Sequence, residues 1–147
     1  MHLTIISVGH KMPAWVTTAT HDYIKRMPAD CSINIKELKP APNSAKDAIQ
    51  IETAIPKGAH VIALDERGQD ISTQDLANHL AQWRQAGINI TFLIGGADGL
   101  DPNLKLRANA LWKLSSLTLP HAFVRVLLCE QLYRAWTILQ GHPYHRE

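Results

Sequence analysis

Short apolar segments alternate with amphipathic helical segments along the chain, and this alternation constrains the fold more than any other feature of the sequence. The apolar runs are rich in Ile, Val, Leu and Thr, which is typical of buried strands. The five predicted strands cover residues 3–8, 33–38, 60–64, 88–94 and 112–114. Because a helix is predicted after each strand, we expect an α/β fold with a largely parallel sheet covered by helices.

Residues that start and stop helices set the predicted helix boundaries. Ser44 is the predicted N-cap of the second helix, and Ser72 with Asp75 forms a near capping box for the third. Asp101 followed by proline opens the fourth helix, and Gly141 closes the last. The helices are predicted over residues 14–27, 44–55, 73–85, 102–110 and 122–140.

The last predicted helix is apolar over most of its circumference. Its apolar residues are Phe123, Val124, Val126, Leu127, Leu128, Leu132, Ala135, Trp136 and Leu139. Such a helix must be covered on two sides, and the sheet supplies only one cover. The other cover is either a second subunit or a deep position in the chain's own core, and the sequence leaves both open.

Composition narrows the class of protein. With 147 residues, 46% hydrophobic and 19% charged, the chain has the size and apolar content of one globular domain, and intrinsic disorder is excluded. No apolar run approaches the about 20 residues of a membrane span, and the N-terminus lacks the features of a signal peptide, so a cytoplasmic protein is expected. Cys31 and Cys129 are expected to be reduced thiols. A net charge of +2 permits a nucleic-acid partner without requiring one.

A glycine-rich turn follows the fourth predicted strand. Gly95, Gly96 and Gly99 leave room for a ligand to approach the backbone, at the carboxyl end of a strand where α/β proteins bind ligands. The pattern is neither the dinucleotide fingerprint nor a phosphate-binding loop with its lysine. A tight turn without a ligand is the equally weighted alternative.

A second candidate segment runs from Leu114 to Arg125. Ser115, Ser116 and Thr118 interrupt its apolar stretch, and small hydroxyl side chains with free backbone groups suit an adenine and ribose pocket. The alternative, favoured by spacing alone, is a loop whose hydroxyls bond their own backbone.

The C-terminal sequence GHPYHRE is the third candidate. Tyr144, His145 and Arg146 combine a stacking ring with cationic donors, which suits an unstacked base and its phosphate. His142 and His145 have no further ligands around them in sequence, so a metal site is not expected. Asp65 with Glu66 resembles an acidic contact to a ribose, but a solvated turn is the favoured interpretation. The tryptophans are predicted to lie in the core: Trp15, Trp83, Trp112 and Trp136.

Taken together, the stretches LIGGADGL, LSSLTLPHAFVRVLLCEQLYRAW and GHPYHRE, with the opening MHLTIISVGHKMPAWV, resemble the RlmH family of SPOUT-type methyltransferases. The resemblance covers nearly the whole chain. It implies one SPOUT domain over residues 1–147, with a C-terminal trefoil knot within about 60–147. It also implies a homodimer that uses S-adenosyl-L-methionine to methylate ring nitrogen 3 of a pseudouridine in 23S rRNA, within the assembled ribosome.

The resemblance also assigns roles to residues. The methyl donor would lie against Leu64, Gly95, Leu114, Ser115, Ser116, Leu117, Thr118 and Leu119. His145 would assist deprotonation of the base, Arg146 would stabilise developing charge or hold phosphate, and Tyr144 would stack on or hydrogen bond the base. RNA contacts would come from His121, Arg125 and Arg134, with an ion pair to Glu130 or to the partner chain as the alternative for Arg134.

One segment departs from the family, and two other functions stay open. Residues 39–59 are shorter and less basic than the family often shows, so no RNA contacts are carried over to them. The first alternative is a non-catalytic RNA- or ribosome-binding module on the same fold. The second is a SPOUT methyltransferase that acts on tRNA or on another rRNA nucleotide.

Overall fold

The computed structural model describes residues 1–9, 11–96 and 98–146. Within these residues, five strands form one sheet in the order β2-β1-β4-β3-β5. Every neighbouring pair is parallel, which confirms the predicted α/β fold with a parallel sheet. The strands are β1 (His2–Val8), β2 (Ser32–Leu38), β3 (His60–Asp70), β4 (Ile90–Ile94) and β5 (Ala110–Lys113).

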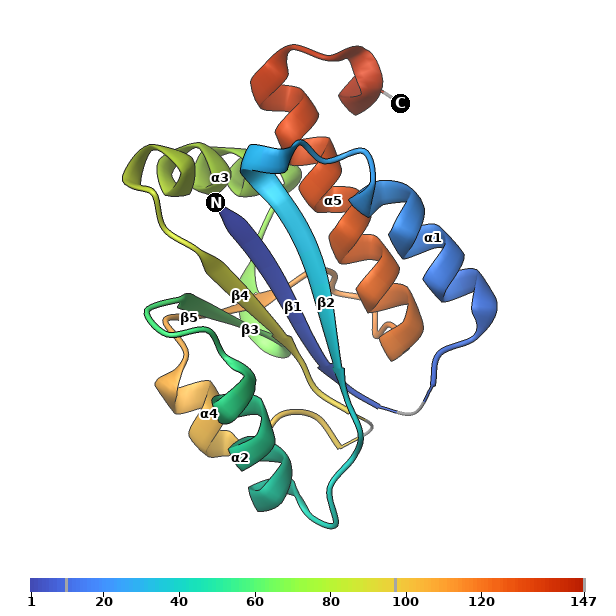
Figure 1. Ribbon diagram of the computed structural model, residues 1–147, viewed down its shortest axis with the longest axis vertical. Helices are drawn as coiled ribbons and strands as arrows, with labels where there is room; N and C mark the ends of the chain where they lie inside the picture. The colour runs from blue at the N-terminus through green and yellow to red at the C-terminus, as the bar shows by residue number, and fades with distance from the viewer. Residues whose placement is uncertain (10, 97, 147) are drawn as a thin grey trace.

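Helices cover both faces of the sheet. Figure 1 shows α2 and α4 together on one side and α1 and α5 on the other. The helices are α1 (Ala14–Ile24), α2 (Ser44–Ala54), α3 (Thr73–Ala86), α4 (Pro102–Arg107) and α5 (His121–Gln140), with short 3₁₀ turns at Ala29–Cys31 and Pro143–Arg146. Across the described residues, no helix has the length and apolar character that crossing a membrane requires.

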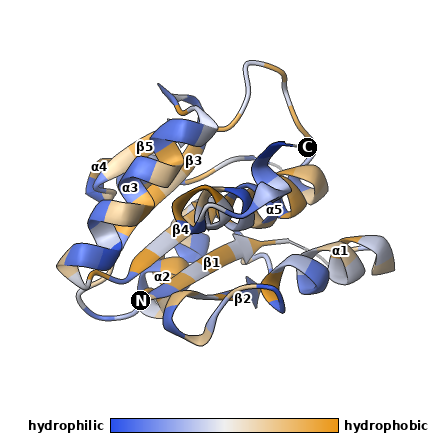
Figure 2. Cartoon of the chain, turned by 90° about the horizontal axis from the view of Figure 1, so that it is seen from above, coloured by the Kyte–Doolittle hydropathy of each residue, from blue (hydrophilic) through white to orange (hydrophobic). Residues whose placement is uncertain are grey.

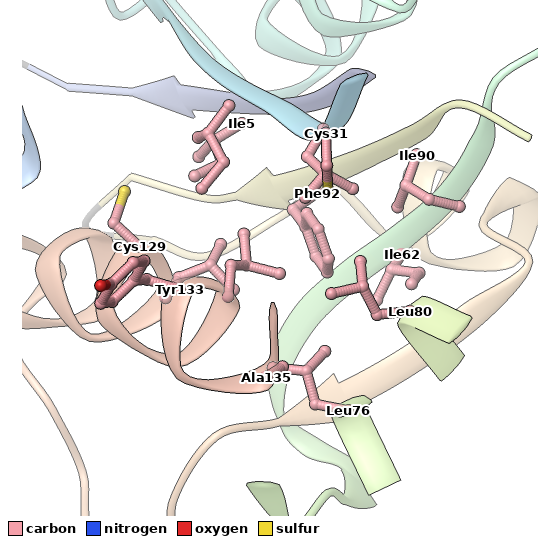
Figure 3. Close-up of a cluster of buried hydrophobic side chains, with 14 of the residues drawn as sticks. Ile5, Cys31, Ile62, Leu76, Leu80, Ile90, Phe92, Cys129, Tyr133 and Ala135 are labelled. Carbon is pink, nitrogen blue, oxygen red and sulfur yellow. The ribbon is translucent and has the colours of Figure 1, made fainter. Parts of the chain in front are cut away.

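Alternate residues of the strands fill two separate cores. Ile62 and Phe92 face the core beneath α3 and α5, where Leu80 and Ala135 also lie (Figure 3). Their strand neighbours Val61 and Leu93 face the second core, beneath α2 and α4. This alternation follows from the two-residue period of a strand. Figure 2 accordingly shows hydrophobic residues along the strands between the helical layers.

Helix α5 is covered on two sides within the one chain. Its Tyr133 ring lies 6.1 Å from the Tyr23 ring of α1, and its Gln131 accepts a hydrogen bond of 2.7 Å from Thr73 of α3. The chain's own core thus buries part of the helix, including Leu128, Leu132 and Ala135, and a second subunit stays a prediction for the rest. Phe123 in its first turn is 53% exposed.

Several predicted caps are confirmed. The Ser72 side chain accepts from the backbone of Asp75, whose carboxylate accepts from the backbone of Ser72 in return, so the capping box is complete. Asp101 caps α4, with proline at the first helical position. Gly141 closes α5 in the left-handed conformation, at φ 68°. The prediction of Ser44 as a cap is wrong, because Asn43 accepts the hydrogen bond from Lys46 and Ser44 is already helical.

Some boundaries differ from the sequence predictions. Helices α1 and α4 end at Ile24 and Arg107, three residues earlier than predicted in each case. Strand β3 continues to Asp70 instead of ending at Leu64, with an irregularity in its pairing to β5 between Leu64 and Gln69. The polar residues after Leu64 hide this continuation, because a strand that leaves the core loses its apolar pattern.

The four tryptophans are placed differently from one another. Trp83 and Trp112 are buried and stack at 5.8 Å between ring centroids, which confirms the prediction for these two. Trp136 is partly buried against the same core. The prediction for Trp15 is wrong, because its side chain is 47% exposed and packs on the exposed ring of Phe123 at 5.3 Å.

Candidate active site

A cavity of about 690 Å³ opens at the carboxyl ends of β3, β4 and β5. Three segments form most of its lining: residues 64–67, the described part of the glycine-rich turn from Ile94 to Leu100, and the connection from Trp112 to His121. Ala97 of that turn lies outside the described residues. Cavities of this volume hold small-molecule ligands and cofactors, and ligands bind at this edge of parallel sheets.

Most of the residues predicted to hold a methyl donor line this cavity. They are Leu64, Gly95, Leu114, Ser115, Leu117, Thr118 and Leu119. Ser116, the remaining one, is exposed and is not among the lining residues. The Ser115 hydroxyl accepts a hydrogen bond of 2.9 Å from the Leu117 backbone, so the alternative of a hydroxyl bonded to its own loop also holds at this position.

Gly95 is required by the backbone of its own turn. A Cβ atom there would lie 2.5 Å from the carbonyl carbon of Gly99 and 2.7 Å from the nitrogen of Leu100. At Gly96 the nearest atom would be 3.5 Å away, an ordinary contact. The turn therefore folds back on itself at Gly95, and this close approach forms one side of the cavity.

His121 joins the first turn of α5 to the glycine-rich turn. Its Nδ1 lies 2.9 Å from the carbonyl oxygen of Gly95, and because a carbonyl only accepts, Nδ1 carries the hydrogen. Its Nε2 is buried without a hydrogen-bond partner among the described residues. Burial is the main cause that lowers the pKa of His121, and it outweighs the opposing hydrogen bond to Gly95. The ring is therefore held in its neutral form at the edge of the cavity.

Asp65 is not the solvated residue that the sequence suggested. Its side chain is only 10% exposed and forms an ion pair of 2.6 Å with Lys105 of α4, while its other oxygen accepts from the Arg67 backbone at 2.8 Å. Burial alone would raise the pKa of Asp65, but these contacts outweigh it and lower the pKa below its ordinary value. Asp65 and Lys105 thus place both signs of charge in the cavity lining.

The C-terminal tail, residues 143–146, lies at the opposite end of α5 from its first turn (Figure 1). The Tyr144 hydroxyl donates to Glu130 at 2.9 Å, and its ring contacts Tyr133 with centroids 4.7 Å apart. Glu130 follows His121 by nine residues, about 14 Å along a helix axis. The predicted catalytic residues of the tail are consequently not among the residues that line the cavity of their own chain.

The residues predicted to contact RNA are engaged within the chain. Arg125 is only 3% exposed, pairs with Glu37 and donates to the Ser7 hydroxyl at 2.6 Å. In this conformation its guanidinium is withdrawn from any phosphate outside the protein. The ion pair to Glu130, weighed as the alternative for Arg134, is confirmed at 2.9 Å.

Sequence reasoning missed Lys105 and Trp112 as lining residues. Neither residue belongs to a sequence motif. In the sequence, Lys105 is one charged residue of a short predicted helix and Trp112 is one apolar residue of a predicted strand. Only the parallel pairing of β5 with β3 brings Trp112 beside Leu64. Among the described residues, no group of three or more His, Cys, Asp or Glu side chains has an arrangement that could hold a metal ion.

A family model described as predicted SPOUT methyltransferase matches residues 1–145, nearly the full length of the chain. The chain belongs to the SPOUT methyltransferase family. The resemblance drawn from its motifs is thereby confirmed, and the cavity described above belongs to a methyltransferase fold.

Several SPOUT relatives match this chain over its full length. A protein of Polynucleobacter asymbioticus named ribosomal RNA large subunit methyltransferase H is 76% identical over 147 residues, which cover 100% of both chains. The protein of the same name from Polynucleobacter necessarius is 67% identical, again over 100% of both. That from Herminiimonas arsenicoxydans is 55% identical over 99% of both.

Solved structures share the SPOUT fold at low sequence identity. A probable methylase family protein of Haemophilus influenzae has a TM-score of 0.64 at 13% identity, covering 97% of this chain and 69% of that one. A putative methylase family protein of Neisseria gonorrhoeae has a TM-score of 0.59 at 16% identity, with coverages of 89% and 81%. These likenesses concern the fold alone.

Proposed function

We propose that this SPOUT methyltransferase transfers the methyl group of S-adenosylmethionine to ring nitrogen 3 of a pseudouridine in 23S rRNA. The assembled ribosome is its substrate and the cytoplasm is its location. The observation that carries the proposal is the cavity at the carboxyl ends of β3, β4 and β5, because the motif residues that resemble a methyl-donor site surround it. The full-length relatives named ribosomal RNA large subunit methyltransferase H support the RNA substrate.

The residues of the cavity fit the proposed donor. Leu64, Leu114 and Trp112 offer apolar surface for a purine, and the backbone of residues 114–119 offers donors and acceptors for its ring edge. Asp65 and Lys105 add one negative and one positive group, which suits the ammonium and carboxylate of an amino acid. When bound, the donor supplies an electrophilic methyl group on a sulfonium.

The chain must also remove a proton from the target base. The ring N–H of a uracil-type base is a weak acid, so the nitrogen becomes a good nucleophile only as that proton leaves. We assign assistance of this step to His145, whose Nδ1 is buried without a partner among the described residues. Arg146 is exposed, and its guanidinium is suited to stabilise the developing anion or to hold a phosphate.

The position of the tail supports a two-subunit site. Because the tail lies far from the cavity of its own chain, we propose a homodimer in which the tail of one subunit completes the cavity of the other. Exposed apolar side chains near the first turn of α5 suit such a contact. They are Trp15, Leu117 and Phe123, which are 47%, 76% and 53% exposed.

We also propose one SPOUT domain over residues 1–147, with a trefoil knot in its C-terminal part, about 60–147. Strand β5 pairs on the outer side of β3, whereas α5 packs against α1 and α3 near the inner strands. The connection between them runs along the cavity at the carboxyl ends of β3 and β4, where most of its residues line that cavity. We propose that this return of the chain takes part in the knot.

The RNA contacts of His121, Arg125 and Arg134 stay predictions. His121 is the best placed of the three, because it lies at the edge of the cavity. Arg125 and Arg134 each require their present carboxylate partner to share or release them before they bind a phosphate.

Methylation of ribosomes tests the proposal. Ribosomes from cells that lack this protein are incubated with the purified protein and labelled S-adenosylmethionine, and the modified nucleotide is mapped. We expect one methyl group on ring nitrogen 3 of a 23S pseudouridine. Label on tRNA or on another nucleotide would overturn the substrate, and calorimetry without any donor binding would favour the non-catalytic ribosome-binding module.

A matched variant separates binding from chemistry. His145→Ala is expected to abolish methylation and to leave donor affinity within twofold of the wild-type value, because its proposed role is proton removal and the methyl donor is held by the residues that line the cavity. Undiminished turnover in this variant would show that the proton acceptor is not His145 but another side chain or water.

A further inference from the structure

The aromatic ring of the tail is half-buried and packs against its own chain. The Tyr144 hydroxyl donates to Glu130 at 2.9 Å and lies 3.3 Å from the Tyr23 hydroxyl. The Tyr133 ring meets it edge-on at 67°, and the Arg134 guanidinium lies 4.9 Å from its centroid. These contacts engage the hydroxyl and pack the ring against Tyr133 and Arg134, so Tyr144 in this position attaches the tail to α5.

Glu130 is the acceptor that holds this arrangement together. One of its carboxylate oxygens accepts from the Tyr144 hydroxyl and from the Arg134 guanidinium, both at 2.9 Å, and the other accepts from Gln131 at 2.7 Å. Its side chain is only 15% exposed. A carboxylate that accepts several hydrogen bonds away from water binds its donors more strongly than a solvated one.

The same carboxylate reaches the next residue of the tail through Arg134. While one part of the guanidinium pairs with Glu130, its Nη1 donates to the backbone oxygen of His145 at 3.3 Å. The tail is thus held at two consecutive residues, by the side chain of Tyr144 and by the backbone of His145. Burial is the main cause that raises the pKa of Tyr144, with contributions from Tyr23 and Glu130, so its hydroxyl keeps the hydrogen that it donates.

We infer that Glu130 is a positioning residue for methyl transfer, because its carboxylate fixes the tail through Tyr144 and Arg134 and so sets where His145 and Arg146 are presented. This inference rests on the proposed function, in which the tail completes the site. Tyr144 then belongs to the attachment of the tail and does not contact the base. Glu130 touches no substrate and acts only through the residues that it holds.

Two substitutions test the attachment with little change of shape. Tyr144→Phe removes the hydroxyl and keeps the ring, and Glu130→Gln removes the charge and keeps the size. Each variant is expected to lower kcat on ribosomes about tenfold, because a hydrogen bond to a charged group is lost. Donor affinity measured by calorimetry stays within twofold of wild type. The double variant loses no more than the Glu130→Gln variant, because both changes break one arrangement.

A second measurement follows the tail without any methylation. Carboxypeptidase is expected to release C-terminal residues faster from both variants than from wild type, because the tail detaches more often. Glu52→Gln is the matched control, since Glu52 forms an ion pair of 2.9 Å with Arg107 on the other face of the sheet. It should change neither kcat nor the rate of digestion.

Two results would overturn the inference. One is wild-type kcat and wild-type digestion in the folded Tyr144→Phe and Glu130→Gln variants. The other is a loss of donor affinity equal to the loss of kcat, which would show that Glu130 acts on the cavity or on the fold. A wild-type protein that methylates no ribosome would instead overturn the proposed function, and the wild-type reaction run beside each variant separates the two failures.

Discussion

Substitution of Gly95 by alanine is expected to damage the cavity more than any other single added methyl group along its edge. The new Cβ atom would lie 2.5 Å from the carbonyl carbon of Gly99, and that contact must open toward the 3.4 Å of an ordinary one. The atoms that it meets belong to the backbone, so no side chain can rotate away. The turn itself must move, and the Gly95 carbonyl that holds His121 moves with it.

The size of the effect follows from the geometry. Forcing a methyl group into closely packed backbone costs about 1–3 kcal/mol of unfolding free energy. If the turn moves far enough to lose one hydrogen bond to S-adenosylmethionine, the loss of about 1.4 kcal/mol weakens the binding of this methyl donor about tenfold. Calorimetry with S-adenosylmethionine measures the affinity, and urea denaturation measures the free energy of unfolding.

The neighbouring glycine provides the control. At Gly96 the added atom finds its nearest neighbour at 3.5 Å, and the residue has no positive φ, so Gly96→Ala should bind donor and unfold like the wild type. Equal affinity and equal stability in the Gly95→Ala and Gly96→Ala variants would refute the argument that the close approach at Gly95 shapes the cavity.

Three further substitutions probe the fold and the cavity separately. Ser72→Ala removes the capping box of α3 and should lower the unfolding free energy, measured by urea denaturation, by about 1 kcal/mol. The affinity for the methyl donor should not change, and a loss of affinity would contradict the view that this helix end is separate from the site. Asp65→Asn breaks the partly buried ion pair with Lys105 and should lower the unfolding free energy by about 1–3 kcal/mol. A double-mutant cycle with Lys105→Met should show strong coupling between the two residues, and additive effects would contradict this. The pKa of His121 is lower in the folded protein than in the unfolded chain, where it is 6.5. The contribution of this neutral ring to the unfolding free energy is therefore fully present above pH 6.5, and it is lost as the pH falls through the pKa of the folded protein. His121→Gln should remove this part of the pH dependence, which urea denaturation at pH 7.5 and pH 5.5 measures; an unchanged difference between the two pH values would contradict it.

The fold was largely predictable because local patterns and global topology agree. The apolar runs, the capping box at Ser72 and the left-handed glycines are local signals, and each coincides with the end or the middle of an observed element. Strand β3 is the main exception. Its outer half, up to Asp70, is polar and exposed, so only its pairing with β5 identifies it as a strand.

The lining of the cavity was predictable from the sequence where backbone groups form it. Gly95 and the segment 114–119 carry sequence signals because glycine and small hydroxyl residues are unusual between apolar segments. Asp65 was interpreted as solvated and Lys105 was missed, because each looks like an ordinary surface charge until the fold brings them within 2.6 Å. Trp15 was misjudged for the opposite reason, since helical spacing predicts an inward face but not whether another element covers it.

The tail shows a further limit of sequence reasoning. Its residue types predict a role in the reaction, but the sequence holds no sign that Tyr144 is attached to Glu130. The two residues are 14 positions apart and meet only because Gly141 turns the chain back after α5. A contact of this kind depends on where the helix ends, and helix ends are among the features that sequence patterns define least well.

Helix α5 makes the spacing between its two ends a fixed length. Its first turn holds His121 against the glycine-rich turn, and Glu130 holds the tail nine residues later. Insertion of one residue between them would advance the tail by about 1.5 Å and rotate it by about 100° around the helix axis. If the tail acts as proposed, an insertion between His121 and Glu130 should therefore impair methylation, because it changes where the tail lies relative to the glycine-rich turn.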